Sequence, residues 1–182
     1  MNKKVLIVLA EGFEEIEAIT SIDVLRRAEV EVVVAGVDGL SITGAHGITV
    51  QADTDIEDIV DLVDAVVLPG GLPGADNLAN SKALKGYLEK MHAAGRHIAA
   101  ICAAPAVVLA STSVLDDHTA TCYPGFEDRF GDSTIFSSDR VVTECNITTS
   151  RGPGTAMEFS LSLVTTLVGS EAAALLEEQM LV

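Results

Sequence analysis

The sequence predicts an α/β protein in which a mainly parallel sheet lies between helices. Apolar runs of strand length recur along the chain and are continuous rather than alternating, which is typical of strands buried on both faces. Stretches with helical spacing follow several of these runs. Alternation of the two patterns favours a parallel sheet covered by helices. The apolar runs are "VLIVLA", "VVVAG", "AVVLPGG" and "IAAICAA".

The first elements form a strand, a helix and a second strand. Residues 4–10 are a continuous apolar run and predict a strand. Residues 11–29 predict a helix, because their apolar side chains recur near helical spacing. Those side chains are Ile16, Ile19, Ile22 and Leu25. Residues 29–36 predict the second strand, and a turn-rich stretch follows at residues 38–44.

The middle of the chain places a glycine corner before the next helix. Residues 64–71 predict a buried strand that ends in two glycines. Residues 80–95 predict a helix with Asn80 or Ser81 as its N-cap and Gly95 as its stop. The alternation of strand and helix therefore continues through residues 64–95.

The second half continues the alternation with one less regular stretch. Residues 97–101 predict a strand that leads to Cys102, and "APAVVLAST" predicts a helix directly after it. Residues 119–150 predict short strands and turns. Two closing helices are predicted at residues 153–169, with Pro153 near the first turn, and at residues 170–180.

Length and composition predict a single domain spanning residues 1–182. No composition break, repeat or linker divides the 182 residues, which suffice for one well-buried core. The apolar runs are shorter than the roughly 20 residues that cross a bilayer. The N-terminal run meets acidic residues at once, unlike a signal peptide. We therefore expect a cytoplasmic protein without a membrane partner.

Charge and cysteine content exclude several functional classes. The chain carries 11 basic and 27 acidic side chains, a net charge of −16, which repels polyanions such as nucleic acids. Its three cysteines, Cys102, Cys122 and Cys145, are an odd number without metal-type spacing. We expect no disulfide framework and no metal site.

The carboxyl ends of the predicted strands indicate one candidate pocket. In an open parallel sheet, ligands bind beyond the carboxyl ends of the strands. The predicted strand ends are Glu11-Gly12, Pro69-Gly70-Gly71, Cys102-Ala103 and Cys122-Tyr123.

Cys102 is the candidate nucleophile because it lies where a strand ends and a helix begins. Such a turn lifts a side chain out of the sheet and aims the first N–H groups of the helix toward it. A helix N-terminus stabilises negative charge, so we expect a lowered thiol pKa at Cys102. The alternative is a small buried core cysteine, the role that we expect for Cys122 and Cys145.

A thiolate also needs a proton donor or acceptor. The stretch "EGFEEIE" offers Glu11, Glu14, Glu15 and Glu17, although acidic residues also simply favour the first turn of a helix. Periodicity alone does not choose among these carboxylates. One held against the thiolate in a partly desolvated site would have a raised pKa and could act as acid and base.

Four motifs in this order resemble the ThiJ/PfpI superfamily, in the branch of the Parkinsonism-associated protein deglycase and bacterial YajL. They are "GFEEIEA", "VLPGG", "AAICAAPAVVLA" and "TSRGPGTAMEF". The resemblance runs over nearly the whole chain. It implies a flavodoxin-like three-layer sandwich that forms a homodimer and needs no cofactor.

The resemblance also implies roles for individual residues. Cys102 matches the reactive cysteine, and Glu17 matches the carboxylic acid that hydrogen-bonds to it. The backbone positions around an oxygen-binding pocket match Gly70, Gly71 and Ala103. In the family, the stretch Ser150 to Gly154, which includes Pro153, lies near the site across the dimer contact.

Two positions depart from the family pattern. Tyr123 stands where relatives commonly have a histidine, and a tyrosine is a poor base near neutral pH. His46 stands where relatives have an arginine. Ala103 replaces the histidine of the protease-like branch, which disfavours proteolysis by a Cys-His pair. Structural roles are expected for the other histidines, His92, His97 and His118.

Three functional hypotheses follow from the resemblance. The first is a cysteine-dependent glyoxalase or deglycase acting on methylglyoxal, glyoxal or early glycation adducts. The second is an oxidative-stress sensor and redox-regulated chaperone for misfolded proteins, in which Cys102 is oxidised. The third is a partner-binding dimer without chemistry.

Overall fold

A seven-stranded sheet forms the centre of the computed structural model, which describes residues 3–182. Its strand order is β10-β11-β7-β6-β1-β2-β5. All neighbours pair in parallel except β10 and β11, which are antiparallel. The strands are β1 (Lys4–Leu9), β2 (Glu31–Gly36), β5 (Thr54–Asp55), β6 (Ala65–Leu68), β7 (His97–Ile101), β10 (Val141–Glu144) and β11 (Ile147–Ser150). The predicted fold class is therefore confirmed.

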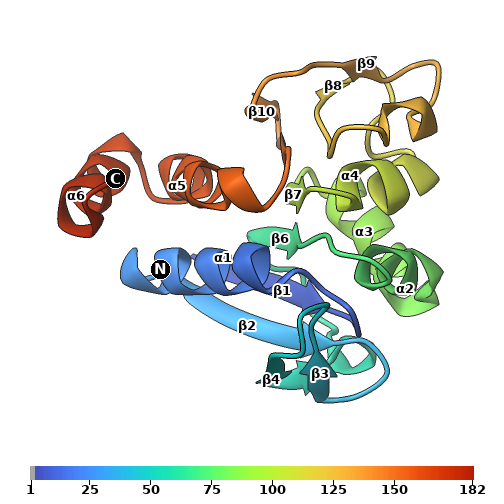
Figure 1. Ribbon diagram of the computed structural model, residues 1–182, viewed down its shortest axis with the longest axis horizontal. Coiled ribbons are helices and arrows are strands. Elements are labelled where there is room, and N and C mark those ends of the chain that lie inside the picture. The colour runs from blue at the N-terminus through green and yellow to red at the C-terminus, as the bar shows by residue number, and fades with distance from the viewer. Residues whose placement is uncertain (1–2) are drawn as a thin grey trace.

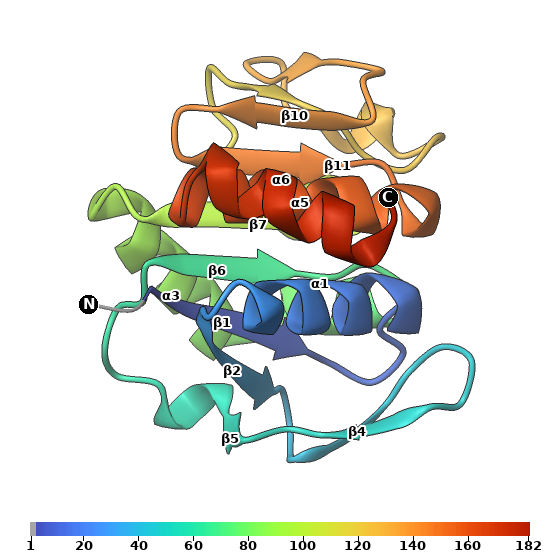
Figure 2. The same cartoon turned by 90° about the vertical axis from the view of Figure 1, so that its left-hand side faces the viewer.

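Six helices cover the two faces of this sheet within the described residues. They are α1 (Glu15–Arg27), α2 (Gly74–Asn80), α3 (Lys82–Ala93), α4 (Ala104–Val107), α5 (Ala156–Leu167) and α6 (Ser170–Met180). Helices α1, α5 and α6 lie on one face, and α2, α3 and α4 lie on the other (Figure 1). Figure 2 shows α1, α5 and α6 in front of the sheet and α3 behind it.

Each face of the sheet has its own apolar core. Successive side chains of a strand point to opposite faces. In β1, Val5 and Ile7 join the core under α1 and α5, whereas Leu6 and Val8 join the core under α3 and α4. Continuous apolar runs are required for this arrangement, which explains the pattern that predicted the fold.

Smaller elements surround the carboxyl end of the sheet. Strands β3 (Ser41–Thr43) and β4 (Thr49–Gln51) form an antiparallel hairpin, and β8 (Thr119–Ala120) pairs in parallel with β9 (Ile135–Phe136). Cys122 and Tyr123 therefore do not follow a strand of the main sheet. The 3-10 turns are Ile56–Asp58, Leu109–Ser111, Glu127–Arg129 and Pro153–Thr155.

Helix α4 is much shorter than the sequence predicted. The prediction extended it to Thr112, but it ends at Val107 and a 3-10 turn follows. The Ser111 hydroxyl donates to the carbonyl oxygen of Val108 (2.8 Å), and the Thr112 hydroxyl donates to that of Leu109 (2.6 Å). Such side-chain bonds compete with the backbone bonds of a continuing helix.

Two further differences concern α1 and α2. Helix α2 was not predicted, because its glycine and asparagines are weak helix formers. In α1, the predicted apolar face is only half buried. Ile22 and Leu25 lie in the core, whereas Ile16 and Ile19 are exposed. Among residues 3–182, no helix combines the length and the hydrophobicity that a membrane span needs.

Candidate active site

Cys102 occupies a tight corner between β7 and α4. Its φ is +66°, a left-handed conformation that non-glycine residues adopt at some energetic cost. Two backbone hydrogen bonds hold it there. The Cys102 N–H donates to the carbonyl oxygen of Ser150 (2.9 Å), and the Tyr123 N–H donates to the carbonyl oxygen of Cys102 (2.8 Å). The predicted strand-to-helix turn is therefore present, and hydrogen bonds to two other segments of the chain fix it.

Gly70 lets a neighbouring strand end approach this corner. A Cβ atom at Gly70 would lie 2.7 Å from Cβ of Cys102 and 2.9 Å from the Ala103 nitrogen, closer than real contacts allow. Gly71 follows with a φ of +87°, which favours glycine. Glycines are therefore favoured at this corner, because a side chain at Gly70 would clash and the backbone of Gly71 is left-handed.

Glu17 reaches the corner from α1 and is fully buried. Its Oε2 accepts the Gly70 N–H at 2.7 Å, and its carboxyl also interacts with the Cys102 thiol. The Gly70 N–H is therefore used by Glu17 rather than offered to a substrate. Oε1 has no oxygen or nitrogen partner in the described part of the chain. Burial raises the pKa of Glu17 to about 7, although the Gly70 N–H and the thiol favour the carboxylate.

The expected low pKa of the Cys102 thiol is wrong. Burial and the adjacent Glu17 carboxylate raise the pKa of Cys102 to about 12, and hydrogen bonds from the N–H groups of Gly71 and Ala103 oppose this only in part. Helix α4 has a single turn, so its dipole is too small to outweigh a neighbouring charge. Burial and the Glu17 charge therefore both favour the protonated thiol over a free thiolate.

Replacing Glu17 by glutamine is expected to stabilise the fold at pH 8 but not at pH 4. The pKa of Glu17 is about 7 in the fold against an ordinary value of 4.5, so the folded state binds more protons between these values. The free energy of unfolding of the wild type therefore falls as pH rises through this window, by about 3 kcal/mol. Glutamine carries no charge and avoids that loss.

Denaturant unfolding at the two pH values measures this difference. Glu29→Gln, the same change at an exposed position, is the matched control and should show no such pH dependence. If Glu17→Gln changed the free energy of unfolding by the same amount at pH 4 and pH 8, Glu17 would not carry a destabilising buried charge at pH 8.

A pocket of about 260 Å³ opens in front of the sulfur. Cys102 lines it and is itself only 7% exposed. The other lining residues are Glu14, Gly71, Leu72, Ala103, Tyr123, Phe126 and Pro153. Four residues proposed from the sequence thus surround Cys102 in one pocket. Sequence reasoning did not single out Leu72 and Phe126, and it left Glu14 as one of four carboxylates.

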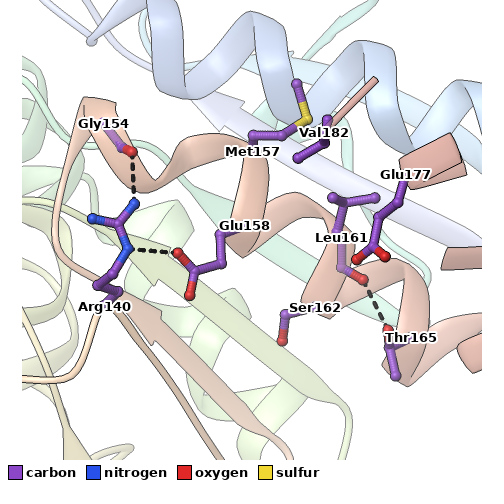
Figure 3. A pocket seen from close by; sticks show the side chains of 9 residues that line it. All are labelled: Arg140, Gly154, Met157, Glu158, Leu161, Ser162, Thr165, Glu177 and Val182. Atoms are coloured by element: carbon purple, nitrogen blue, oxygen red, sulfur yellow. Dashed lines mark hydrogen bonds and ion pairs between the residues drawn. The ribbon is translucent and has the colours of Figure 1, made fainter. Parts of the chain in front are cut away.

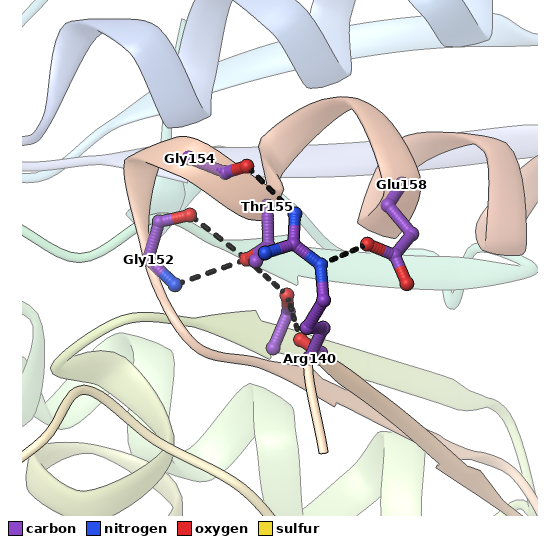
Figure 4. A network of polar contacts seen from close by, with 6 residues as sticks. Arg140, Gly152, Gly154, Thr155 and Glu158 are labelled. Carbon is purple, nitrogen blue, oxygen red and sulfur yellow. Dashed lines mark hydrogen bonds and ion pairs between the residues drawn. The ribbon is translucent and has the colours of Figure 1, made fainter. Parts of the chain in front are cut away.

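Pro153 lines the pocket of its own chain. A contribution of its stretch across a dimer contact stays a prediction. A polar network fixes this loop (Figure 4). Arg140 donates from Nε to Glu158 (2.7 Å) and from a terminal nitrogen to the Gly154 carbonyl oxygen (3.0 Å). The Thr155 hydroxyl accepts the Gly152 N–H at 3.1 Å. These bonds tie the loop to β10 and to the first turn of α5.

His46 lies outside the pocket lining. It is exposed, and its Nδ1 lies 2.9 Å from a Glu15 oxygen and 3.6 Å from a Glu14 oxygen. The hydrogen bond to Glu15 and the charge of Glu14 raise the pKa of His46. Burial alone would raise the pKa of Glu15, but bonds from His46 and Ile48 lower it to about 2. The imidazole thus ties the β3–β4 hairpin to α1 beside the pocket.

The same three side chains are the metal-ligand grouping found in the described residues. One ligand atom each from Glu14, Glu15 and His46 lies within 4.8 Å of the others. Their mutual hydrogen bond and ion pairs account for this closeness without a metal ion.

A larger hollow of about 620 Å³ lies between Arg140, α5 and α6 (Figure 3). Its lining in the described chain includes no cysteine or histidine. Met157 and Leu161 supply apolar contacts, and the Arg140–Glu158 ion pair lies at its rim. The smaller pocket therefore holds the reactive group.

The remaining cysteines and histidines have structural surroundings. Cys122 is fully buried, as expected, and burial raises its pKa to about 11. Cys145 was expected in the core but is exposed, with a φ of +53° in the turn between β10 and β11. His97 is buried against Thr148 (3.0 Å), and burial lowers its pKa to about 4. His118 bonds the Asp116 carbonyl oxygen (2.7 Å).

Comparison with known proteins agrees with this geometry. The model of the DJ-1/PfpI family matches residues 3–166. Protein DJ-1 homolog B of Arabidopsis thaliana is 46% identical over 174 residues, which are 94% of this chain and 40% of that protein. The chain thus spans less than half the length of that relative.

Two further relatives are matched over most of their length. The glutathione-independent glyoxalase DJR-1.2 of Caenorhabditis elegans is 36% identical over 173 residues, which are 93% of this chain and 91% of that protein. The crystal structure of Drosophila melanogaster DJ-1beta superposes with a TM-score of 0.96 at 38% identity, over 100% of this chain and 99% of that one. The chain therefore belongs to the DJ-1/PfpI family.

Proposed function

We propose that the protein converts small 2-oxoaldehydes, such as methylglyoxal, into 2-hydroxy acids, with Cys102 as nucleophile and Glu17 as acid and base. One observation carries the proposal. A buried carboxylate with a pKa of about 7 interacts with a thiol that lines the pocket. A base is most effective when its pKa lies near the working pH. A relative named as a glutathione-independent glyoxalase supports this choice of reaction.

The first step is addition of sulfur to the aldehyde carbon. Glu17 accepts the thiol proton as the carbon–sulfur bond forms, because burial and the Glu17 charge disfavour a free thiolate. The aldehyde oxygen then takes up that proton, which gives a hemithioacetal. We assign stabilisation of the developing oxyanion to the N–H groups of Gly71 and Ala103, because both are hydrogen-bonded to the adjacent sulfur.

The second step moves hydrogen between the two carbons. Glu17 removes the proton from the carbon bonded to sulfur, which lies one bond from the atom that Glu17 contacts. The electron pair forms an enediol, and a proton is returned to the neighbouring carbon. The first carbon is thereby oxidised to a thioester and the second is reduced to an alcohol, so no external oxidant is needed. Water then cleaves the thioester and restores the thiol.

Lactate formation from methylglyoxal, without added thiol or cofactor, tests the proposal. We expect turnover above the buffer rate with one lactate for each methylglyoxal consumed. Consumption without lactate would indicate simple adduct formation and would contradict the proposed reaction.

Oxidation of Cys102 is the second candidate function. The observation that favours it is that two N–H groups, from Gly71 and Ala103, surround a sulfur that lines an open pocket. We propose that two equivalents of hydrogen peroxide convert the thiol to a sulfinic acid, each adding one oxygen and leaving as water.

Mass spectrometry of peptides after mild peroxide treatment tests the oxidation. A gain of two oxygens is expected at Cys102 and not at buried Cys122. The exposed Cys145 reports how far the reagent reacts with an accessible thiol. An unmodified Cys102 beside oxidised Cys145 would overturn this second candidate.

A further inference from the structure

We infer that the pocket selects 2-oxoaldehydes with a bulky apolar substituent, in particular an aromatic one, and that Phe126 and Tyr123 determine this specificity. The inference rests on the proposed function and names its substrate class. Four features of the pocket support it: its apolar rim, the way that rim is fixed to the nucleophile, its size and its charge.

The rim consists of apolar side chains from three separate segments. Leu72 follows β6, Tyr123 and Phe126 follow β8, and Pro153 follows β11. Leu72 is 48% exposed and Tyr123 is 45% exposed, so both offer apolar surface that a substituent could cover. Covering such surface favours binding in proportion to the area removed from water.

The aromatic pair is fixed to the nucleophile. The Tyr123 N–H is bonded to the Cys102 carbonyl oxygen, and the Phe126 N–H donates to the Tyr123 carbonyl oxygen at 3.1 Å. The two rings meet edge to face with centroids 6.3 Å apart. Arg129 lies 5.0 Å from the centre of the Phe126 ring and supports it. A substituent on a substrate bonded to sulfur would meet rings already in place.

Gly152 brings the tyrosine ring close to the sulfur. A Cβ atom at Gly152 would lie 3.1 Å from Cδ2 of Tyr123 and 4.0 Å from Sγ of Cys102. The absence of a side chain there allows the ring and the sulfur to share one small space.

The pocket is larger than methylglyoxal requires. Its 260 Å³ corresponds to roughly nine water molecules at about 30 Å³ each. Methylglyoxal has three carbons and two oxygens, so it would fill roughly half of this space. A phenyl group in place of the methyl group would fill most of the remainder.

The charge of the pocket disfavours acidic substituents. Glu14 is the charged side chain in its described lining, and only 11% of that side chain is exposed. A carboxylate on the substrate would meet this acid in a chain of net charge −16. Apolar substituents avoid that repulsion.

The experiment compares kcat/KM for phenylglyoxal and methylglyoxal in the wild type, Phe126→Ala, Tyr123→Ala and Phe136→Ala. The ratio of the two constants in each variant is divided by the wild-type ratio, so that the intrinsic reactivity of each aldehyde cancels. Phe136 lies on β9 outside the pocket and is the matched control. Thermal unfolding of each variant shows that it folds.

Phe126→Ala is expected to lower kcat/KM for phenylglyoxal about tenfold more than it lowers kcat/KM for methylglyoxal. Tyr123→Ala should act in the same direction, and Phe136→Ala should leave the ratio unchanged. The inference would be overturned if both pocket variants kept the wild-type ratio of kcat/KM values, whether or not they lost activity toward both aldehydes. The proposed function would still stand. Absence of turnover of either aldehyde by the wild type would overturn the proposed function and the inference with it.

Discussion

Cys102→Ser is expected to lower methylglyoxal turnover by more than about a thousandfold, to the level of the buffer. A serine hydroxyl ionises far less readily than a thiol, and a carboxylate with a pKa of about 7 is too weak a base to activate it. The sulfur also becomes the leaving group when water cleaves the thioester. Both the addition and the release are therefore lost. Lactate formation at pH 8 is the measurement.

Cys145→Ser is the control for this substitution. It makes the same atomic change at an exposed turn between β10 and β11, away from the pocket. Its turnover should equal that of the wild type. If Cys102→Ser kept a tenth or more of the activity, Cys102 would not be the nucleophile.

Glu17→Gln is expected to lower kcat/KM by about 10²- to 10⁴-fold, the usual contribution of an acid–base group. The amide keeps a carbonyl oxygen for the Gly70 N–H but cannot accept the thiol proton. In the wild type, kcat/KM should fall about tenfold for each pH unit below about 7, because Glu17 is protonated there. The residual kcat/KM of Glu17→Gln should lack this fall below pH 7.

Glu15→Gln provides the comparison on the same helix. Its carboxylate accepts bonds from His46 and Ile48 and does not line the pocket. The variant should keep the inflection near pH 7 even if the hairpin contact loosens. An inflection that survives in Glu17→Gln would assign the base to another residue.

The fold could be predicted from the sequence because its strands are buried on both faces. The apolar run at residues 4–10 is explained by a strand that contributes side chains to both cores. Val5 and Ile7 lie in one core, and Leu6 and Val8 lie in the other. The same pattern placed the strand at residues 97–101 and therefore the corner at Cys102. Helix α2 was missed because its residues are weak helix formers, and the close approach of Gly74 to Gly12 and Phe13 cannot be read from spacing.

Part of the pocket lining was predictable from the sequence, but its electrostatics were not. The resemblance placed Glu17 beside Cys102, and periodicity alone had left four carboxylates open. The thiol pKa was predicted in the wrong direction because helix α4 proved too short and because the effect of the Glu17 charge depends on how deeply both groups are buried. Phe126 was missed since a lone aromatic residue in an irregular stretch gives no periodic signal.

The most direct test is the pH dependence of iodoacetamide alkylation at Cys102, followed by peptide mass spectrometry in the wild type and in Glu17→Gln. Attack by this sulfur requires an adjacent unprotonated carboxylate in the proposed reaction. The alkylation rate in the wild type should therefore rise with an inflection near pH 7, and the variant should lose that inflection. If the alkylation rate of Cys102 depended on pH in the same way in both proteins, Glu17 would not control this thiol.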